Sequence, residues 1–166
     1  MSGVKILGID PGLAGGLALL CPHDGIILEP MFIDDEGKLD VVKLALWIGG
    51  HASEIRVCYL EKVNGAPIGG RQKGSFGAFN FGMGFGILRG ILAACGVRTV
   101  LVRPQEWQKV MHKGLDPKQD SKLRSYEAFE KIFPDIDAYK TDRSKKPHEG
   151  MVEALLIAEF GRRSLE

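Results

Sequence analysis

Apolar and polar positions divide the chain into short strand-like runs and longer helical patterns. Apolar runs bounded by Gly, Pro or Asp predict strands, and apolar residues three or four positions apart predict helices. The predicted strands cover residues 4–9, 15–20, 25–33, 55–61 and 98–102. The predicted helices cover residues 39–48, 76–95, 105–111, 117–133 and 149–162.

The order of these elements indicates the fold class. Three strands joined by tight turns come first, followed by alternating helix and strand, and finally by helices alone. This order predicts an α/β fold in which helices cover a mixed sheet. A chain of 166 residues is long enough for one domain with a sizeable core and short for two, so we expect residues 1–166 to form a single domain.

Cysteine usage and hydropathy favour a cytoplasmic protein. Cys21, Cys58 and Cys95 are far apart and odd in number, which fits a reducing compartment. The first residues lack the basic and apolar regions of a secretion signal. The longest uncharged stretch of the glycine-rich middle, residues 74–88, has 15 residues, whereas a membrane span needs about 20. We therefore expect a protein that is not secreted and has no membrane partner.

Charge is distributed unevenly along the chain. Residues 1–66 carry a net charge of −4, residues 67–148 carry +7 and residues 149–166 carry −2. A basic middle between acidic ends would place carboxylates beside a cationic surface, which suits an anionic substrate bound through metal ions. Taken alone, the same numbers are better explained by an ordinary solvated surface.

Four carboxylates stand where chemistry could occur. Asp10 follows the first strand in an Asp-Pro-Gly turn, and Glu61 closes the fourth strand. Glu149 and Glu153 lie one turn apart on the last predicted helix, with apolar residues around Glu153. A turn-forming role would explain Asp10 equally well, and a surface position is the more common explanation for Glu61. A solvated helix stripe is the usual explanation for charges on a helix, but it fits Glu149 and Glu153 less well because little around Glu153 is polar. If the four converge, divalent cations must offset their repulsion, and such oxygen ligands select Mg²⁺ or Mn²⁺.

Three stretches carry a resemblance that covers nearly the whole chain. They are ILGIDPGLAGGLALL, the segment YLEKVNGAPIGGRQKGSFGAFNFGMGFGILRGILAACGVRTVLVRPQEWQKVM, and HEGMVEALLIAEFG. Together they resemble the RuvC family of Holliday junction resolvases, and more closely its phage-type branch. The resemblance implies a ribonuclease H-like fold with a mixed five-stranded sheet flanked by helices. It also implies a homodimer that nicks four-way DNA junctions symmetrically with Mg²⁺, in the cytoplasm of a bacterium or of a phage-infected bacterium.

The resemblance assigns metal-site roles to the carboxylates. Asp10 matches the acid of the family's first strand, Glu61 the second acid, and Glu153 the last acid of the closing helix. Bacterial RuvC proteins carry two aspartates three residues apart in that helix, whereas this chain has Gly150 three residues before Glu153. We therefore assign the third-acid role to Glu149.

His148 is the rival for that third role, as a ligand or a proton donor. The expected mechanism uses two Mg²⁺ ions per active site, for which Mn²⁺ can substitute, and gives 5′-phosphate and 3′-hydroxyl ends. Lys118 or Lys122, one turn apart on the predicted helix 117–133, is expected near the scissile phosphate. No cofactor other than metal is expected.

Basic and aromatic side chains supply the expected DNA contacts. Phe76 borders a glycine-rich loop and could stack on an unpaired base, whereas a core position is favoured for Phe79 and Phe81. Gly82, Gly86 and Gly90 recur every four residues and would permit close approach to the sheet or across a dimer. The expected basic contacts are Arg71, Lys73, Lys109, Lys113, Lys118, Lys122, Arg124, Arg143, Lys145 and Lys146.

Other functions stay open at this point. The same fold would serve a ribonuclease H-type enzyme or a flap-type debranching nuclease. The glutamates in place of aspartates also fit a junction-binding protein with weak or no catalysis. An actin-like ATP-binding protein shares the Asp-x-Gly turn, but it needs a second lobe that 166 residues do not supply.

Overall fold

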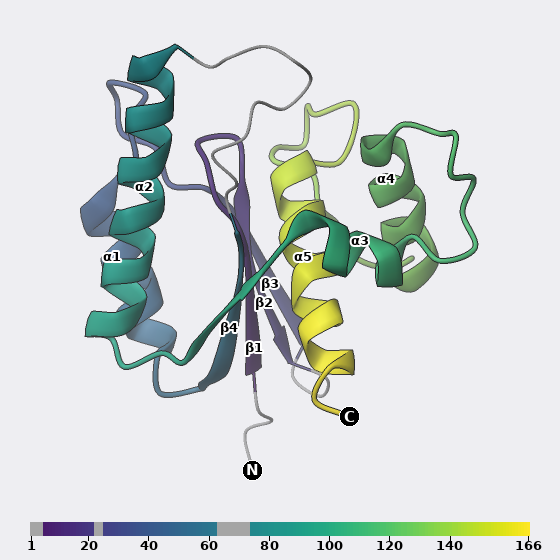
Figure 1. The fold of residues 1–166 in the computed structure, drawn as a ribbon, viewed down its shortest axis with the longest axis horizontal. Helices are drawn as coiled ribbons and strands as arrows, with labels where there is room; N and C mark the ends of the chain where they lie inside the picture. Colours follow the sequence, from purple (N-terminus) through teal and green to yellow (C-terminus); the bar gives the residue numbers. More distant parts are fainter. Residues whose placement is uncertain (1–4, 22–24, 63–73) are drawn as a thin grey trace.

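The strand β1 (Lys5–Asp10) lies at the centre of a five-stranded mixed sheet (Figure 1). The computed structural model describes residues 5–21, 25–62 and 74–166. β1 pairs antiparallel with β2 and parallel with β4, and β4 pairs parallel with β5. The predicted mixed sheet is thereby confirmed. Its order is β3-β2-β1-β4-β5, with β2 (Gly16–Cys21), β3 (Gly25–Pro30), β4 (Ile55–Glu61) and β5 (Thr99–Val102).

Helices cover both faces of this sheet. α1 (Val41–His51) and α2 (Ser75–Ala94) lie on one face. On the other face lie α3 (Pro104–Met111), α4 (Ser121–Ile132) and α5 (Glu149–Arg163) (Figure 1). Because successive strand residues point to opposite faces, each face has its own core. Leu7 and Ile9 join the core under α1 and α2, whereas Ile6 joins the core under α5.

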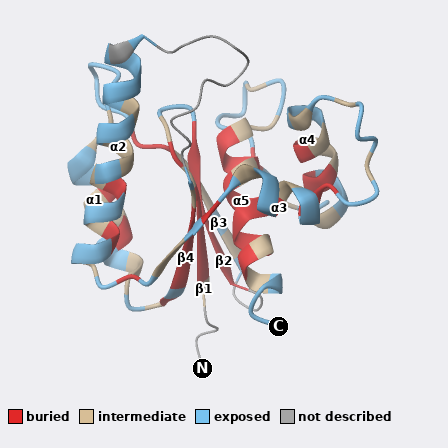
Figure 2. Ribbon diagram, in the orientation of Figure 1, coloured by how far each residue is buried: buried red, intermediate tan, exposed pale blue. Residues whose placement is uncertain are grey.

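Glycine brings α5 close to the central strand. A Cβ on Gly8 of β1 would lie 2.1 Å from the backbone oxygen of Ala154, so the helix can approach this closely only over a residue without a side chain. Around Glu153, the apolar residues of α5 are buried, as Figure 2 shows for most of the helix. The first turn of α5 consequently lies beside the end of β1, where Gly15 and Gly150 form a bridge.

The predicted helix 117–133 begins later than the sequence pattern suggested. α4 starts at Ser121, because the Asp120 side chain caps it by accepting a hydrogen bond from the Lys122 backbone N–H at 2.9 Å. Asp116 accepts a similar bond from the Lys118 backbone at 2.9 Å and closes a preceding turn. Lys118 therefore lies outside the helix, and the prediction that it stands one helical turn from Lys122 was wrong.

The outer face of α2 is exposed and apolar (Figure 2). Phe79 is 66% exposed, so the core position favoured for it was wrong. A Cβ on Gly82, Gly86 or Gly90 would meet no atom of the described residues within 4 Å, so these glycines do not mediate approach to the sheet. By length and composition, α2 from Phe76 to Ala94 could also cross a membrane. From the sequence we expected no membrane span, because the longest uncharged stretch in this region has only 15 residues. A single helix of this kind is weak evidence for a membrane span.

Candidate active site

The four carboxylates converge beside the carboxyl ends of two neighbouring parallel strands. Asp10 ends β1 and Glu61 ends β4, whose register pairs Ile9 with Leu60. Glu149 and Glu153 reach the same place from the start of α5. Burial raises the pKa of Asp10 well above its usual value, and the negative charges of Glu61, Glu153 and Glu149 raise it further. The structure thus brings together the four acids that the sequence singled out.

Glu61 is held by a tryptophan from the next element. The indole Nε1–H of Trp107 in α3 donates a hydrogen bond to Glu61 Oε2 at 2.6 Å. Burial raises the pKa of Glu61, and this hydrogen bond opposes the rise by stabilising the ionised form. Trp107 is fully buried, as a packing residue is, and it also contacts the site.

Glu153 is held by a serine that belongs to no recognisable sequence motif. Ser125 of α4 donates from its hydroxyl to Glu153 Oε1 at 3.2 Å. Burial raises the pKa of Glu153 to about 7, with further contributions from the charges of Glu61 and Glu149. A carboxylate with this pKa changes its protonation state near neutral pH, so its charge responds strongly to a nearby cation.

Glu149 differs from the other three acids because it has a cationic partner. Lys122 Nζ lies 3.0 Å from Glu149 Oε1, at the outer rim of the site. This pair raises the pKa of Lys122, so the lysine stays charged. Of the two lysines expected near the scissile phosphate, the structure places Lys122 beside the acids, whereas Lys118 lies in the turn before α4.

His148 acts as the N-cap of α5. Its Nδ1 accepts a hydrogen bond from the Met151 backbone N–H at 3.2 Å. Burial lowers the pKa of His148, and the charge of Lys140 lowers it further. Because Nδ1 accepts from the helix backbone, the neutral ring carries its hydrogen on Nε2 and has no free lone pair for a metal ion. This favours Glu149 over His148 as the ligand in the third-acid role.

The arrangement of the four acids bears on whether they can hold metal ions. In the described part of the chain, no group of three or more His, Cys, Asp or Glu side chains is arranged to hold a metal ion as the side chains stand. The carboxylates nevertheless influence one another's pKa, and none of the ion pairs among the described residues involves Asp10, Glu61 or Glu153. Side-chain torsions adjust more readily than the backbone positions that bring the acids together, so the convergence of the four acids matters more for metal binding than their present rotamers. An all-oxygen set of half-buried, mutually repelling acids fits Mg²⁺ or Mn²⁺.

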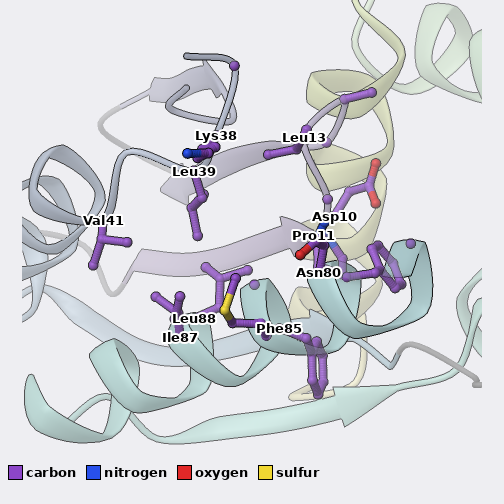
Figure 3. A pocket seen from close by; sticks show the side chains of 18 of the residues that line it. Asp10, Pro11, Leu13, Lys38, Leu39, Val41, Asn80, Phe85, Ile87 and Leu88 are labelled. Carbon is purple, nitrogen blue, oxygen red and sulfur yellow. The ribbon is translucent and has the colours of Figure 1, made fainter. Parts of the chain in front are cut away.

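A groove of about 920 Å³ opens beside the acids (Figure 3). Asp10, Glu149 and Lys122 contribute to its wall. Figure 3 shows Asp10 and Pro11 near one end, with apolar side chains of α2 such as Leu88 farther along. Phe76 also lines the groove and is 76% exposed, which places an aromatic ring on the surface near the acids.

The remaining expected DNA contacts fall into three groups. Arg71 and Lys73 lie outside the described residues. Arg124 is half-buried, and its Nε has no hydrogen-bond partner in the described part of the chain. The exposed basic residues are Lys109, Lys113, Lys118, Lys122, Arg143, Lys145 and Lys146.

Solved structures with the same fold come from two sources. The chain superposes on RuvC of T. thermophilus in complex with a Holliday junction substrate, with a TM-score of 0.63 and 16% identity over 97% of this chain and 96% of that chain. Another structure of Thermus thermophilus RuvC gives a TM-score of 0.56 and 14% identity, with 96% of each chain covered. The yeast mitochondrial Holliday junction resolvase Ydc2 gives 0.60 and 12% identity over 98% of this chain and 78% of that chain.

No protein-family model and no curated protein sequence matches the chain. At these low identities the structural likeness establishes the fold alone. The chain therefore has the ribonuclease H-like α/β fold, with a mixed five-stranded sheet flanked by helices, that these resolvases share.

Proposed function

We propose that this chain is a Mg²⁺-dependent endonuclease that resolves four-way DNA junctions by paired symmetric nicks. The observation that carries the proposal is the convergence of Asp10, Glu61, Glu149 and Glu153 at one edge of a sheet whose fold matches that of junction resolvases. Asp10 and Glu153 are half-buried and carry raised pKa values without an ion-pair partner among the described residues. Divalent cations would provide the missing compensation.

The acids and Lys122 would divide the chemistry between them. Asp10, Glu61, Glu149 and Glu153 would hold two Mg²⁺ ions, which, when bound, supply an activated water and stabilise charge on the phosphate and the leaving oxygen. Asp10 is the most deeply placed acid and would serve both ions. Lys122, at the exposed rim, would hold the scissile phosphate by its charge. Hydrolysis would leave 5′-phosphate and 3′-hydroxyl ends.

The groove and the exposed lysines would bind the junction. The basic residues of α3, α4 and the segment before α5 would neutralise phosphates, which predicts strongly salt-dependent binding. The apolar lining of the groove suits a base better than a phosphate, and the exposed ring of Phe76 would stack on an unpaired base at the branch point.

A homodimer would place two active sites on one junction. Two nicks related by a twofold axis require two sites with that symmetry. The outer face of α2 supports this assembly, because Phe79 and Met83 are exposed there beside the open Gly82, Gly86 and Gly90. A second copy would remove this apolar surface from water. The protein would work on DNA in the bacterial or phage-infected cytoplasm.

A junction-binding protein with little catalysis is the second candidate. Two observations favour it: Glu149 is already paired with Lys122, and the acids are not arranged for a metal ion as they stand. The pair is partly exposed, and such pairs contribute only about 0–1 kcal/mol, so a metal ion could displace it at small cost.

The proposal is tested by cleavage of three labelled substrates with Mg²⁺, with Mn²⁺ and with a chelator. A fixed four-way junction, a flap and an RNA–DNA hybrid would be compared at equal concentration. Symmetric junction nicking that needs the metal would support the proposal. Preferred cleavage of the flap or the hybrid would replace it with one of the related nucleases. Tight junction binding without any nicking would favour the second candidate.

A further inference from the structure

α3 contributes no carboxylate to the site. One of its residues and the residue that caps its C-terminal end are nevertheless connected to two of the acids by hydrogen bonds. Trp107 donates its indole N–H to Glu61 at 2.6 Å. His112 caps the end of the same helix, and its ring meets the Trp107 ring edge-on with centroids 5.6 Å apart. Both rings are buried, with Trp107 at 0% and His112 at 5% exposure.

His112 reaches Glu153 through a single serine. His112 Nε2 lies 3.1 Å from Ser125 Oγ, and Ser125 Oγ lies 3.2 Å from Glu153 Oε1. Ser125 is 1% exposed, so both contacts are shielded from water. A serine hydroxyl has one hydrogen. When Glu153 is ionised, as a metal ligand must be, its carboxylate can only accept, so the serine hydrogen points to it. The serine oxygen then accepts from His112, which fixes the imidazole hydrogen on Nε2.

Plain packing does not account for a histidine at this position. The other ring nitrogen, Nδ1, is buried and has no hydrogen-bond partner in the described part of the chain. Leaving a polar atom unpaired in the interior costs free energy that an apolar residue of similar size would avoid. The contact of Nε2 with Ser125 is what the histidine provides and an apolar residue would not.

We propose that His112 is a positioning residue that holds Glu153 through Ser125, while Trp107 holds Glu61, so that α3 sets the placement of both carboxylates. Both connections start from the rings of Trp107 and His112, which contact each other at the end of α3. One runs from His112 through Ser125 to Glu153, and the other joins Trp107 directly to Glu61. Movement of α3 would shift both acids together. This inference rests on the proposed metal site, because its consequence is the geometry that the acids offer to a metal ion.

The test is the affinity of the intact protein for Mn²⁺, measured by calorimetry and by electron paramagnetic resonance of free Mn²⁺. Ser125→Ala removes the link with little change in volume, and His112→Leu removes the donor. Loss of a hydrogen bond to a metal ligand typically weakens metal binding by about 10–100-fold, and we expect a loss of this size in both variants. His112→Gln keeps an N–H donor and should recover most of the affinity.

Met111→Leu is the matched control, because Met111 is buried next to His112 and contacts no acid through a hydrogen bond in the described structure. It should bind Mn²⁺ like the wild type, and melting temperatures should show that all variants are folded. Wild-type affinity in both Ser125→Ala and His112→Leu would overturn the positioning role and leave the metal site standing. Absence of Mn²⁺ binding in the wild type, with no effect of Glu153→Gln, would overturn both.

Discussion

Gly150 at the start of α5 lies directly against the backbone of Gly15. A Cβ on Gly150 would stand 2.3 Å from the carbonyl carbon of Gly15 and 2.4 Å from the backbone oxygen of Ala14. No side chain fits there without a backbone shift. An acid three residues before Glu153, the position at which the bacterial RuvC proteins that this sequence resembles carry aspartate, is thereby excluded. Glu149 is the neighbouring position from which a carboxylate reaches the site.

An aspartate introduced at position 150 should therefore lower the free energy of unfolding. Gly150→Asp would force α5 away from the turn after β1, at a cost of about 1–3 kcal/mol or more in unfolding free energy. Chemical denaturation measures this directly. Gly50→Ala on α1, where a Cβ meets nothing within 4 Å, is the control and should be neutral or slightly stabilising. An aspartate at position 150 that leaves stability unchanged would show that the close contact with Gly15 is wrong.

Stability should depend on pH through Glu153. Its pKa is raised from 4.5 to about 7 in the folded protein, so the folded state binds more protons than the unfolded state between these values. The stabilisation is present below pH 4.5 and is lost as pH rises through about 7, which amounts to a few kcal/mol at most.

The measurement is the unfolding free energy of metal-free protein as a function of pH, for the wild type and for Glu153→Gln. Subtracting one curve from the other removes the contribution of the histidines. Their lowered pKa values make the unfolding free energy rise with pH, which is opposite to the effect of Glu153. A difference that does not change between pH 4.5 and 7 would contradict the raised pKa of Glu153. Adding Mg²⁺ at the upper end should restore stability, because the ion favours the ionised acid.

Lys122 should matter more than Lys118 for cleavage. Lys122→Met removes the charge beside Glu149, and we expect the cleavage rate to fall by roughly 10²–10³-fold, as for other groups that stabilise transition-state charge. Lys118→Met, in the turn before α4, should mainly weaken junction binding. Single-turnover rates at saturating protein separate the two effects, and equal rate losses would contradict the placement of Lys122.

The exposed face of α2 should be a dimer interface. Met83→Glu places a charge on this face and should convert a dimer to a monomer in analytical ultracentrifugation. Leu123→Glu, on the exposed side of α4, is the control and should leave the dimer intact. The monomer should lose coordinated cleavage of the two junction strands. A wild-type protein that sediments as a monomer at micromolar concentration would remove the basis for paired nicking.

Local pattern was enough to predict the strands and to single out the four acids, because strand ends and helical spacing are properties of neighbouring residues. Their role as a metal site was expected only from the family resemblance. That Asp10 and Glu61 share one sheet edge follows from the parallel pairing of their strands, which the structure shows and the local pattern does not determine. Ser125 could not be found this way, since its contact with Glu153 depends on how α4 packs on α5.

Two misjudged details have similar causes. The predicted start of α4 at Pro117 was wrong, because the helix begins only after Asp120, whose side chain caps it. The core position of Phe79 was wrong because an apolar pattern does not reveal whether a helix face meets the sheet or solvent.

The central claim is that the four acids form a metal-dependent nuclease site with Asp10 at its centre. Asp10→Asn keeps the shape of the side chain and removes its charge. The most direct test is nicking of a fixed four-way junction with Mg²⁺ by wild type and Asp10→Asn, alongside gel-shift binding of the same junction. We predict that the variant binds the junction and does not nick it. Nicking at the wild-type rate by Asp10→Asn would contradict the account.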